Sequence, residues 1–162
     1  MIILFFTIDN EKKTLTGKPI YIMADQSFIF EPWLDPDYSI MLGSAYISVD
    51  IQTSTGKLQH ISGFNPIDTW LAKELFRPVS FNGNVIVKSD LFLSGGGEYY
   101  ADNWRTFYDK VTGWVCIGNP DISNDDLVKN VEFAKDTIAS IRNQKLLALW
   151  VRPEIVDEMH IY

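Results

Sequence analysis

The chain has 162 residues, of which 46% are apolar and 22% charged, and its formal net charge is −7. This composition excludes a disordered chain, and the length suits one domain that spans residues 1–162 around one core. The acidic balance disfavours nucleic acid and membrane as direct partners, because both carry negative charge, and it favours a basic protein partner.

The small number of cysteines and histidines limits the disulfide bonds and metal sites that the chain can form. The single cysteine, Cys116, allows no intrachain disulfide, and one thiol with two separated histidines does not provide a zinc site. We therefore expect a reduced, cytoplasmic location and no cofactor. The apolar residues 1–8 lack the basic region and cleavage site of a signal peptide and are too short to span a bilayer, so they are interpreted as a strand.

The first part of the sequence predicts strands joined by turns. Residues 1–8 and 20–23 are expected to pair around the polar loop 9–19, and residues 28–30 form a third strand. The segment 45–51 alternates apolar and polar side chains. That alternation predicts a strand with one buried face.

The centre of the sheet is expected at residues 109–120. Residues 114–117 form a short apolar run bounded by glycine, which is typical of a strand buried on both faces. A turn at Thr112-Gly113 would join this run to a strand over residues 104–108. Pro120 then ends the strand, because proline cannot donate to a β-ladder.

Residues 124–142 allow two interpretations. Apolar residues recur at helical spacing from Leu127 to Ile141, which predicts one long helix. The alternative is a short helix followed by a hairpin that joins residues 137–141 to 146–151. We favour this alternative because the second run is strongly strand-like and the first begins with β-branched residues.

Together these elements predict an α+β fold. An antiparallel β-sheet built from hairpins would dominate, with one or two helices packed on one side. A further short helix or irregular crossover is expected at residues 67–76. Trp114 and Trp150 lie in the least charged strand-like runs and are expected in the core.

No catalytic motif stands out. His60 lies in an expected strand and His160 near residue 162, and neither has a nucleophile or a carboxylate at motif spacing. Cys116 lies between two apolar residues and is expected to be buried and unreactive. The glycine run 95–97 is followed by Glu98 rather than by a helix and a lysine, so it does not match a phosphate-binding loop. A non-enzyme is favoured, although catalytic groups that converge only in three dimensions stay open.

A segment that begins at Asp121 is similar to the calcium-binding loop of the EF-hand family. Asp121, Asp125 and Glu132 take its first, fifth and twelfth positions. However, Asp126 replaces the glycine of the sharp turn, and Lys129 occupies a ligand position. We therefore expect a capped helix start here, without bound metal.

Acidic residues mixed with aromatic ones mark two candidate partner-binding loops. Aromatic side chains can anchor a partner, while acids steer a basic one. In one loop the alternative is that Trp33 and Leu34 pack against the core. The other loop, beside the glycine run, is the stronger candidate. The residues expected to bind a partner are Glu98, Tyr99, Tyr100 and Asp102 in the stronger loop, and Glu31, Asp35 and Asp37 in the other.

Three segments carry a family resemblance: residues 61–66 (Ile-Ser-Gly-Phe-Asn-Pro), residues 108–118, and residues 131–134 with 148–153. They resemble small, uncharacterised bacterial proteins of the kind found among the immunity proteins of polymorphic-toxin systems. The resemblance implies a cytoplasmic protein that binds and blocks one toxin domain without catalysis, and it assigns no site residue. The alternative is a small-ligand-binding protein or an enzyme.

Overall fold

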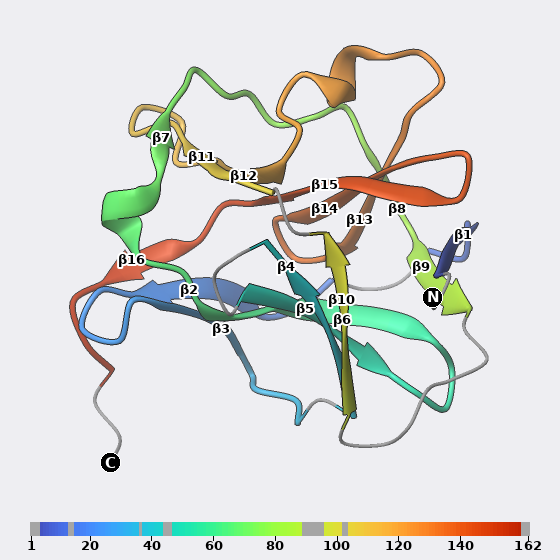
Figure 1. Cartoon of the computed structure of the whole chain (residues 1–162), viewed down its shortest axis with the longest axis horizontal. Helices are drawn as coiled ribbons and strands as arrows, with labels where there is room; N and C mark the ends of the chain where they lie inside the picture. Colours follow the sequence, from blue (N-terminus) through green and yellow to red (C-terminus); the bar gives the residue numbers. More distant parts are fainter. Residues whose placement is uncertain are drawn as a thin grey trace.

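Two β-sheets pack face to face, as the two stacked layers of Figure 1 show. The computed structural model describes residues 4–12, 15–35, 37–43, 47–88, 96–101 and 104–159, with the main chain alone for residues 96–99, 101 and 123. The first sheet has nine strands, in the order β10-β4-β5-β6-β3-β2-β16, and β1 and β9 join it through β6. Its strands are β1 (Phe5–Asp9), β2 (Lys18–Ile22), β3 (Ser27–Glu31), β4 (Tyr38–Leu42), β5 (Ile47–Gln52), β6 (Lys57–Phe64), β9 (Asn84–Lys88), β10 (Gly96–Ala101) and β16 (Glu154–Val156).

The second sheet has seven strands in the order β7-β11-β12-β15-β14-β13-β8. Its inner strands are antiparallel to their neighbours, whereas β7 on β11 and β8 on β13 are parallel pairs at the two ends. The first sheet repeats this plan, with β10 parallel to β4 and β16 parallel to β2. The strands are β7 (Leu71–Ala72), β8 (Phe81–Asn82), β11 (Thr106–Tyr108), β12 (Val115–Gly118), β13 (Lys129–Ala134), β14 (Thr137–Arg142) and β15 (Lys145–Val151).

The prediction of an α+β fold is wrong, because the fold is all-β. Among the described residues the helices are two 3-10 turns of three residues each, η1 (Ile67–Thr69) and η2 (Ile122–Asn124). Of the apolar residues whose spacing resembled a helix, those from Val131 to Ile141 lie in β13 and β14, whereas Leu127 is exposed in the loop before β13. β14 is buried at all but its last position, so it shows no period of two, and a register shift between Glu132 and Ala134 interrupts the alternation of β13.

Local hairpins were predicted more accurately than long-range pairing. The hairpin that joins 137–141 to 146–151 is confirmed as β14 and β15, with Asn143 and Gln144 both at positive φ in the turn. The pairing of residues 104–108 with the 114–117 run is confirmed as β11 and β12. The expected hairpin between the first strand and residues 20–23 is wrong, because β1 pairs with β9 and β2 pairs with β3.

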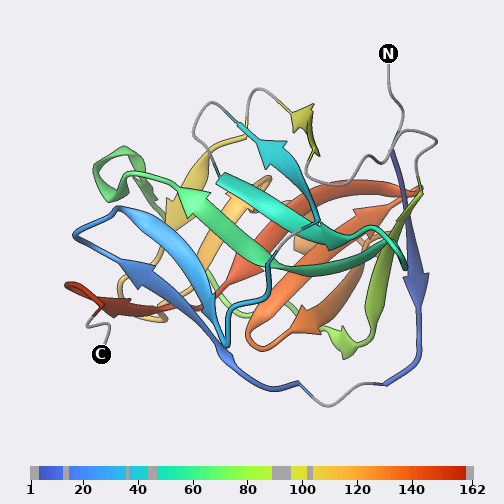
Figure 2. The ribbon, with the colours of Figure 1, turned by 90° about the horizontal axis from the view of Figure 1, so that it is seen from below.

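The main core lies between the sheets, and a smaller one lies on the outer face of the second sheet. The main core combines residues of both sheets, such as Tyr21 and Val49 with Val131 and Leu149. The smaller core is covered by Leu75, from the extended segment between β7 and β8, and its other buried members are Trp114, Cys116, Ile138, Ala148 and Trp150. Figure 2 shows the strands of the two layers from below. The predicted core positions of Trp114 and Trp150 are confirmed, at 4% and 2% exposure.

No helix in the described part of the chain has the length and apolar character needed to cross a bilayer.

Cys116 is expected to be chemically inert in the folded protein. Its side chain is fully buried in the smaller core, and burial raises the pKa of the thiol, with a further increase from the charge of Asp121. Titration with an aromatic disulfide should therefore show almost no modification under native conditions and one thiol in denaturant. Rapid native modification would mean that β12 opens readily.

Candidate functional site

A buried polar cluster lies on the face of the first sheet that is turned away from the second. Ile47, Val49 and Ile51 of β5 point into the main core, so the alternating Ser48 and Asp50 point to the opposite face. Asp50 is fully buried. Its Oδ1 accepts hydrogen bonds from the hydroxyls of Ser39 (2.8 Å) and Ser48 (3.3 Å), and its Oδ2 accepts one from Ser62 (2.5 Å). Asp50 therefore links β4, β5 and β6.

His60 lies next to this carboxylate and is 1% exposed. Its Nδ1 is 3.2 Å from Oδ2 of Asp50, but neither ring nitrogen has a hydrogen-bond partner of acceptable geometry within the described residues. The imidazole stacks on Phe30, with ring centroids 5.5 Å apart, and Trp33 lies over it at 5.1 Å. The Ser62 hydroxyl bonds to Asp50 rather than to His60, which is not the serine–histidine contact of a catalytic triad.

Trp33 belongs to residues 31–35, which we call the Trp33 segment. Figure 1 shows this light-blue segment, after β3, on the side of the first sheet that faces away from the second. Trp33 and Leu34 are 47% and 51% exposed, so the alternative that both pack into the core is wrong for Leu34 and only half right for Trp33. The underside of the indole rests on His60, while the rest of the ring stays open to a partner.

The acids of this loop differ in how they are held. Glu31 is exposed and lies 4.0 Å from the ammonium of Lys18, and the exposed Asp35 accepts a hydrogen bond from Trp33 Nε1 at 3.0 Å. Asp37 accepts hydrogen bonds from the main-chain N–H and the hydroxyl of Thr53, at 3.1 and 3.2 Å. Asp37 thus fixes the end of the loop, while Glu31 and Asp35 present charge beside Trp33.

The other expected partner-binding residues fall on β10, a strand at the end of the first sheet rather than a loop. Glu98 and Tyr99 pair with Ile40 and Met41 of β4. The hydroxyl of Tyr100 donates to the carbonyl of Leu146 and accepts from its N–H, both at 3.0 Å, and burial raises the pKa of Tyr100. Asp102 lies outside the described residues, as do His160 and Gly95. Contact of this strand with a partner stays a prediction.

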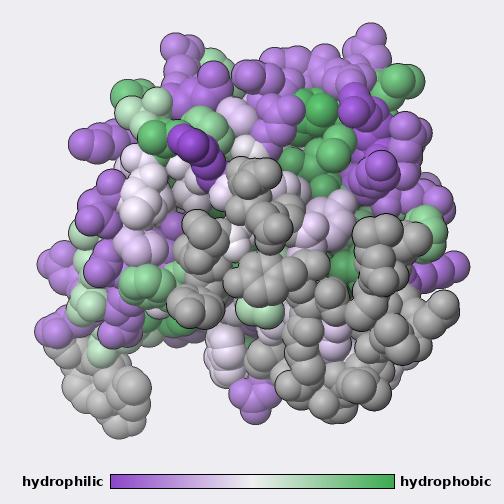
Figure 3. Space-filling view, viewed as in Figure 1, coloured by the Kyte–Doolittle hydropathy of each residue, from purple (hydrophilic) through white to green (hydrophobic). Residues whose placement is uncertain are grey.

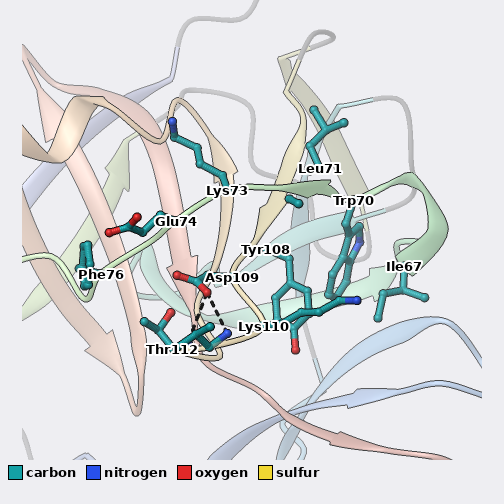
Figure 4. Close-up of a pocket in the computed structure, with 12 residues that line it drawn as sticks. Ile67, Trp70, Leu71, Lys73, Glu74, Phe76, Tyr108, Asp109, Lys110 and Thr112 are labelled. Carbon is teal, nitrogen blue, oxygen red and sulfur yellow. Dashed lines mark hydrogen bonds between the residues drawn. The ribbon is translucent and has the colours of Figure 1, made fainter.

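A second feature of the surface is an apolar groove of about 980 Å³ (Figure 4). It lies between the segment 67–76 and the turn 108–112, which the parallel pairing of β7 with β11 brings together. We call it the β7–β11 groove. On the face in Figure 3, hydrophilic residues predominate around the outer rim and apolar residues occur in patches between them. The groove is lined by Ile67, Trp70, Leu71, Ala72, Lys73, Glu74, Phe76, Tyr108, Asp109, Lys110, Val111 and Thr112.

Asp109 holds the two walls of this groove together. Its Oδ2 accepts from Leu75 N–H at 2.8 Å, and its Oδ1 accepts from Val111 N–H at 2.8 Å and from Thr112 N–H at 3.4 Å. The hydroxyl of Thr112 in turn donates to the carbonyl of Leu75. The hydrogen bond from Leu75, followed by that from Val111, lowers the pKa of Asp109 below its ordinary value of 3.8.

Replacing Asp109 by asparagine should lower the melting temperature at pH 7, because an amide nitrogen would face main-chain donors. A carboxylate whose pKa is depressed by folding contributes stability above its unfolded pKa, near 3.8, and loses it as pH falls through the folded value. The melting-temperature gap between wild type and Asp109→Asn should therefore narrow below pH 3.8. A gap that stays constant from pH 7 to pH 2 would show that the charge of Asp109 does not matter.

The segment similar to a calcium loop forms a turn around η2 rather than the expected helix start. Asp125 accepts a hydrogen bond from Leu127 N–H and pairs with Arg142 at 2.5 Å, and these two contacts lower the pKa of Asp125. The described residues contain no group of three or more acidic, histidine or cysteine side chains placed to hold a metal ion. Absence of calcium binding stays a prediction.

Sequence reasoning missed both the buried cluster and the groove. The sequence feature that could have indicated the cluster is a serine in each of three successive strands: Ser39, Ser48 and Ser62. These serines become neighbours once β4, β5 and β6 pair. The groove left no local signal, because its walls are separated by more than thirty residues in the sequence.

Comparison of the sequence with protein-family models and with curated proteins finds no match, so the function is argued from the chain's own residues.

Proposed function

We propose that this chain is a cytoplasmic, non-catalytic binding protein that blocks a basic partner protein, in the manner of a toxin-specific immunity protein. The observation that carries the proposal is the Trp33 segment. It combines two half-exposed apolar side chains, Trp33 and Leu34, with the exposed carboxylates of Glu31 and Asp35. Interfaces use this combination: a large aromatic anchor surrounded by charges that steer the partner.

The support beneath Trp33 favours this use. The indole of Trp33 rests on His60, which itself stacks on Phe30. The indole Nε1 of Trp33 donates a hydrogen bond to Asp35. Because the ring is fixed before binding, little conformational entropy is lost when a partner covers it. The net charge of −7 adds long-range attraction for a basic partner, which raises the association rate.

The contacts of His60 favour binding over catalysis at this face. The three serine hydroxyls around the cluster all donate to Asp50, which leaves none of them activated by the imidazole. The cluster then serves to position Trp33. Its catalytic use would require a nucleophile or substrate to reach His60 beneath the indole.

The experiment compares what three tagged forms of the chain capture from the native host. The wild type and a control variant, Leu127→Ala, should retain the same basic protein, because Leu127 is 74% exposed on a loop remote in sequence from the Trp33 segment. The variant Trp33→Ala with Leu34→Ala should lose it, and adding wild-type chain to the purified partner should suppress the partner's activity.

Equal capture by all three forms, or a captured partner whose activity is unaffected, would contradict the proposal. Melting temperatures of the three forms are measured in parallel. They separate loss of the binding surface from loss of the fold.

A further inference from the structure

We propose that the β7–β11 groove is a binding site for a small molecule with a flat aromatic body and one anionic group. This site is independent of the Trp33 segment and goes beyond partner binding. Its volume of about 980 Å³ is at the upper end of the range for organic ligands. The groove has a rigid aromatic floor, and its two ends differ in charge.

The floor is formed by Trp70 and Tyr108, whose rings lie 5.4 Å apart at 73° to each other. Trp70 is fixed from several sides. Its Nε1 donates to Asn65 Oδ1 at 3.1 Å, and its ring stacks on Phe28 and meets Tyr21 edge-on. Two rings held nearly at right angles offer one face and one edge to a planar ligand, the two arrangements that aromatic rings prefer.

Asn65 ties this floor to the rest of the fold. Its Nδ2 donates to Thr106 Oγ1 at 2.8 Å, and its carbonyl accepts from the hydroxyl of Tyr21 at 2.8 Å. Asn65 is 2% exposed. The floor is therefore supported by buried, hydrogen-bonded groups and is formed before any ligand arrives, which favours a ligand of defined shape.

The charges around the groove favour an anionic group at one end. The carboxylate of Asp109 already accepts hydrogen bonds from main-chain N–H groups. The side chain of Lys73 points away from the groove in Figure 4, and its ammonium pairs with Asp121 at 3.6 Å. Lys110 extends along Tyr108 toward the end that holds Trp70. Among the described residues no carboxylate forms a salt bridge with Lys110. Glu74 lies at the opposite end, beside Phe76. A carboxylate at the Trp70 end would thus meet Lys110 and avoid Glu74.

The test uses three probes that share one ring system and differ in charge: 2-naphthoate, 2-naphthamide and 2-naphthylmethylammonium. Each is titrated into ¹⁵N-labelled full chain and followed by the Trp70 indole N–H and the main-chain N–H of Val111. We expect saturable shifts at these groups, with 2-naphthoate bound about twofold to fivefold more tightly than the amide and the ammonium bound most weakly. This preference should shrink in high salt.

Variants assign the preference to Lys110. Lys110→Gln should bind 2-naphthoate and 2-naphthamide equally. Lys145 is the exposed first residue of β15, and Lys145→Gln should keep the wild-type preference. Three results would each overturn the proposal: no saturable binding of 2-naphthoate, shifts centred elsewhere, or a preference that survives Lys110→Gln. Partner capture by the Trp33 segment is measured separately, so either proposal can fail without the other.

Discussion

Trp150→Ala is expected to lower the free energy of unfolding by about 3–5 kcal/mol, the usual cost of removing a buried tryptophan. The indole is 2% exposed in the smaller core, and its Nε1 donates to Ser140 Oγ at 2.9 Å. Ser140 Oγ also lies 2.6 Å from Asn130 Oδ1, so the truncation opens a cavity and breaks a chain of buried hydrogen bonds. Urea unfolding followed by far-UV circular dichroism measures the change.

A conservative variant separates the two contributions at Trp150. Trp150→Phe keeps most of the apolar volume and loses the N–H donor, so it should cost about 1–3 kcal/mol, less than alanine. If Trp150→Ala unfolds at the same urea concentration as wild type, the indole does not lie in the smaller core with Cys116 and Ile138.

Asp50→Ala is expected to lower the free energy of unfolding by about 3 kcal/mol or more, because it removes the shared acceptor of a buried network. Three serine hydroxyls on three strands would lose their partner, and His60 would lose its neighbouring carboxylate. Asp50→Asn should cost less, since one oxygen can still accept. Equilibrium unfolding at pH 7 provides the measurement.

A double-mutant cycle tests whether these residues act as one network. Ser62→Ala alone should destabilise the wild type, but it should have a much smaller effect in the Asp50→Ala background, because its acceptor is already gone. Purely additive effects would contradict the shared-acceptor arrangement. An unchanged stability of Asp50→Ala would contradict burial of the carboxylate.

The parts of the fold that the sequence predicts correctly are those in which the paired strands are close together in the sequence. The β11–β12 and β14–β15 hairpins have turn residues within a few positions of both strands, so local chemistry indicates them. The pairing of β1 with β9 joins segments about eighty residues apart, and no short pattern records it. The helix prediction for residues 124–142 is wrong because the alternation of β13 is short and is interrupted by a register shift between Glu132 and Ala134, while β14 is buried on both faces and carries no alternation.

The same distinction applies to the candidate sites. The acidic and aromatic residues around Trp33 are adjacent in the sequence, so their role as a candidate binding surface was predictable. That Trp33 rests on His60 was not, because this contact depends on how the segment folds back over β6. Asp50 is fully buried, whereas its alternation with core residues suggested a half-exposed strand.

The most direct test of partner binding through the Trp33 segment is the association rate of the captured partner at low and high salt. Glu31→Lys with Asp35→Lys should slow association severalfold at low salt, and the difference from wild type should nearly vanish at high salt. The control, Asp126→Lys with Asp157→Lys, makes the same change in net charge at other exposed acids and should slow association much less. If both double variants slow association equally, or neither does, the Trp33 segment is not the face that meets the partner.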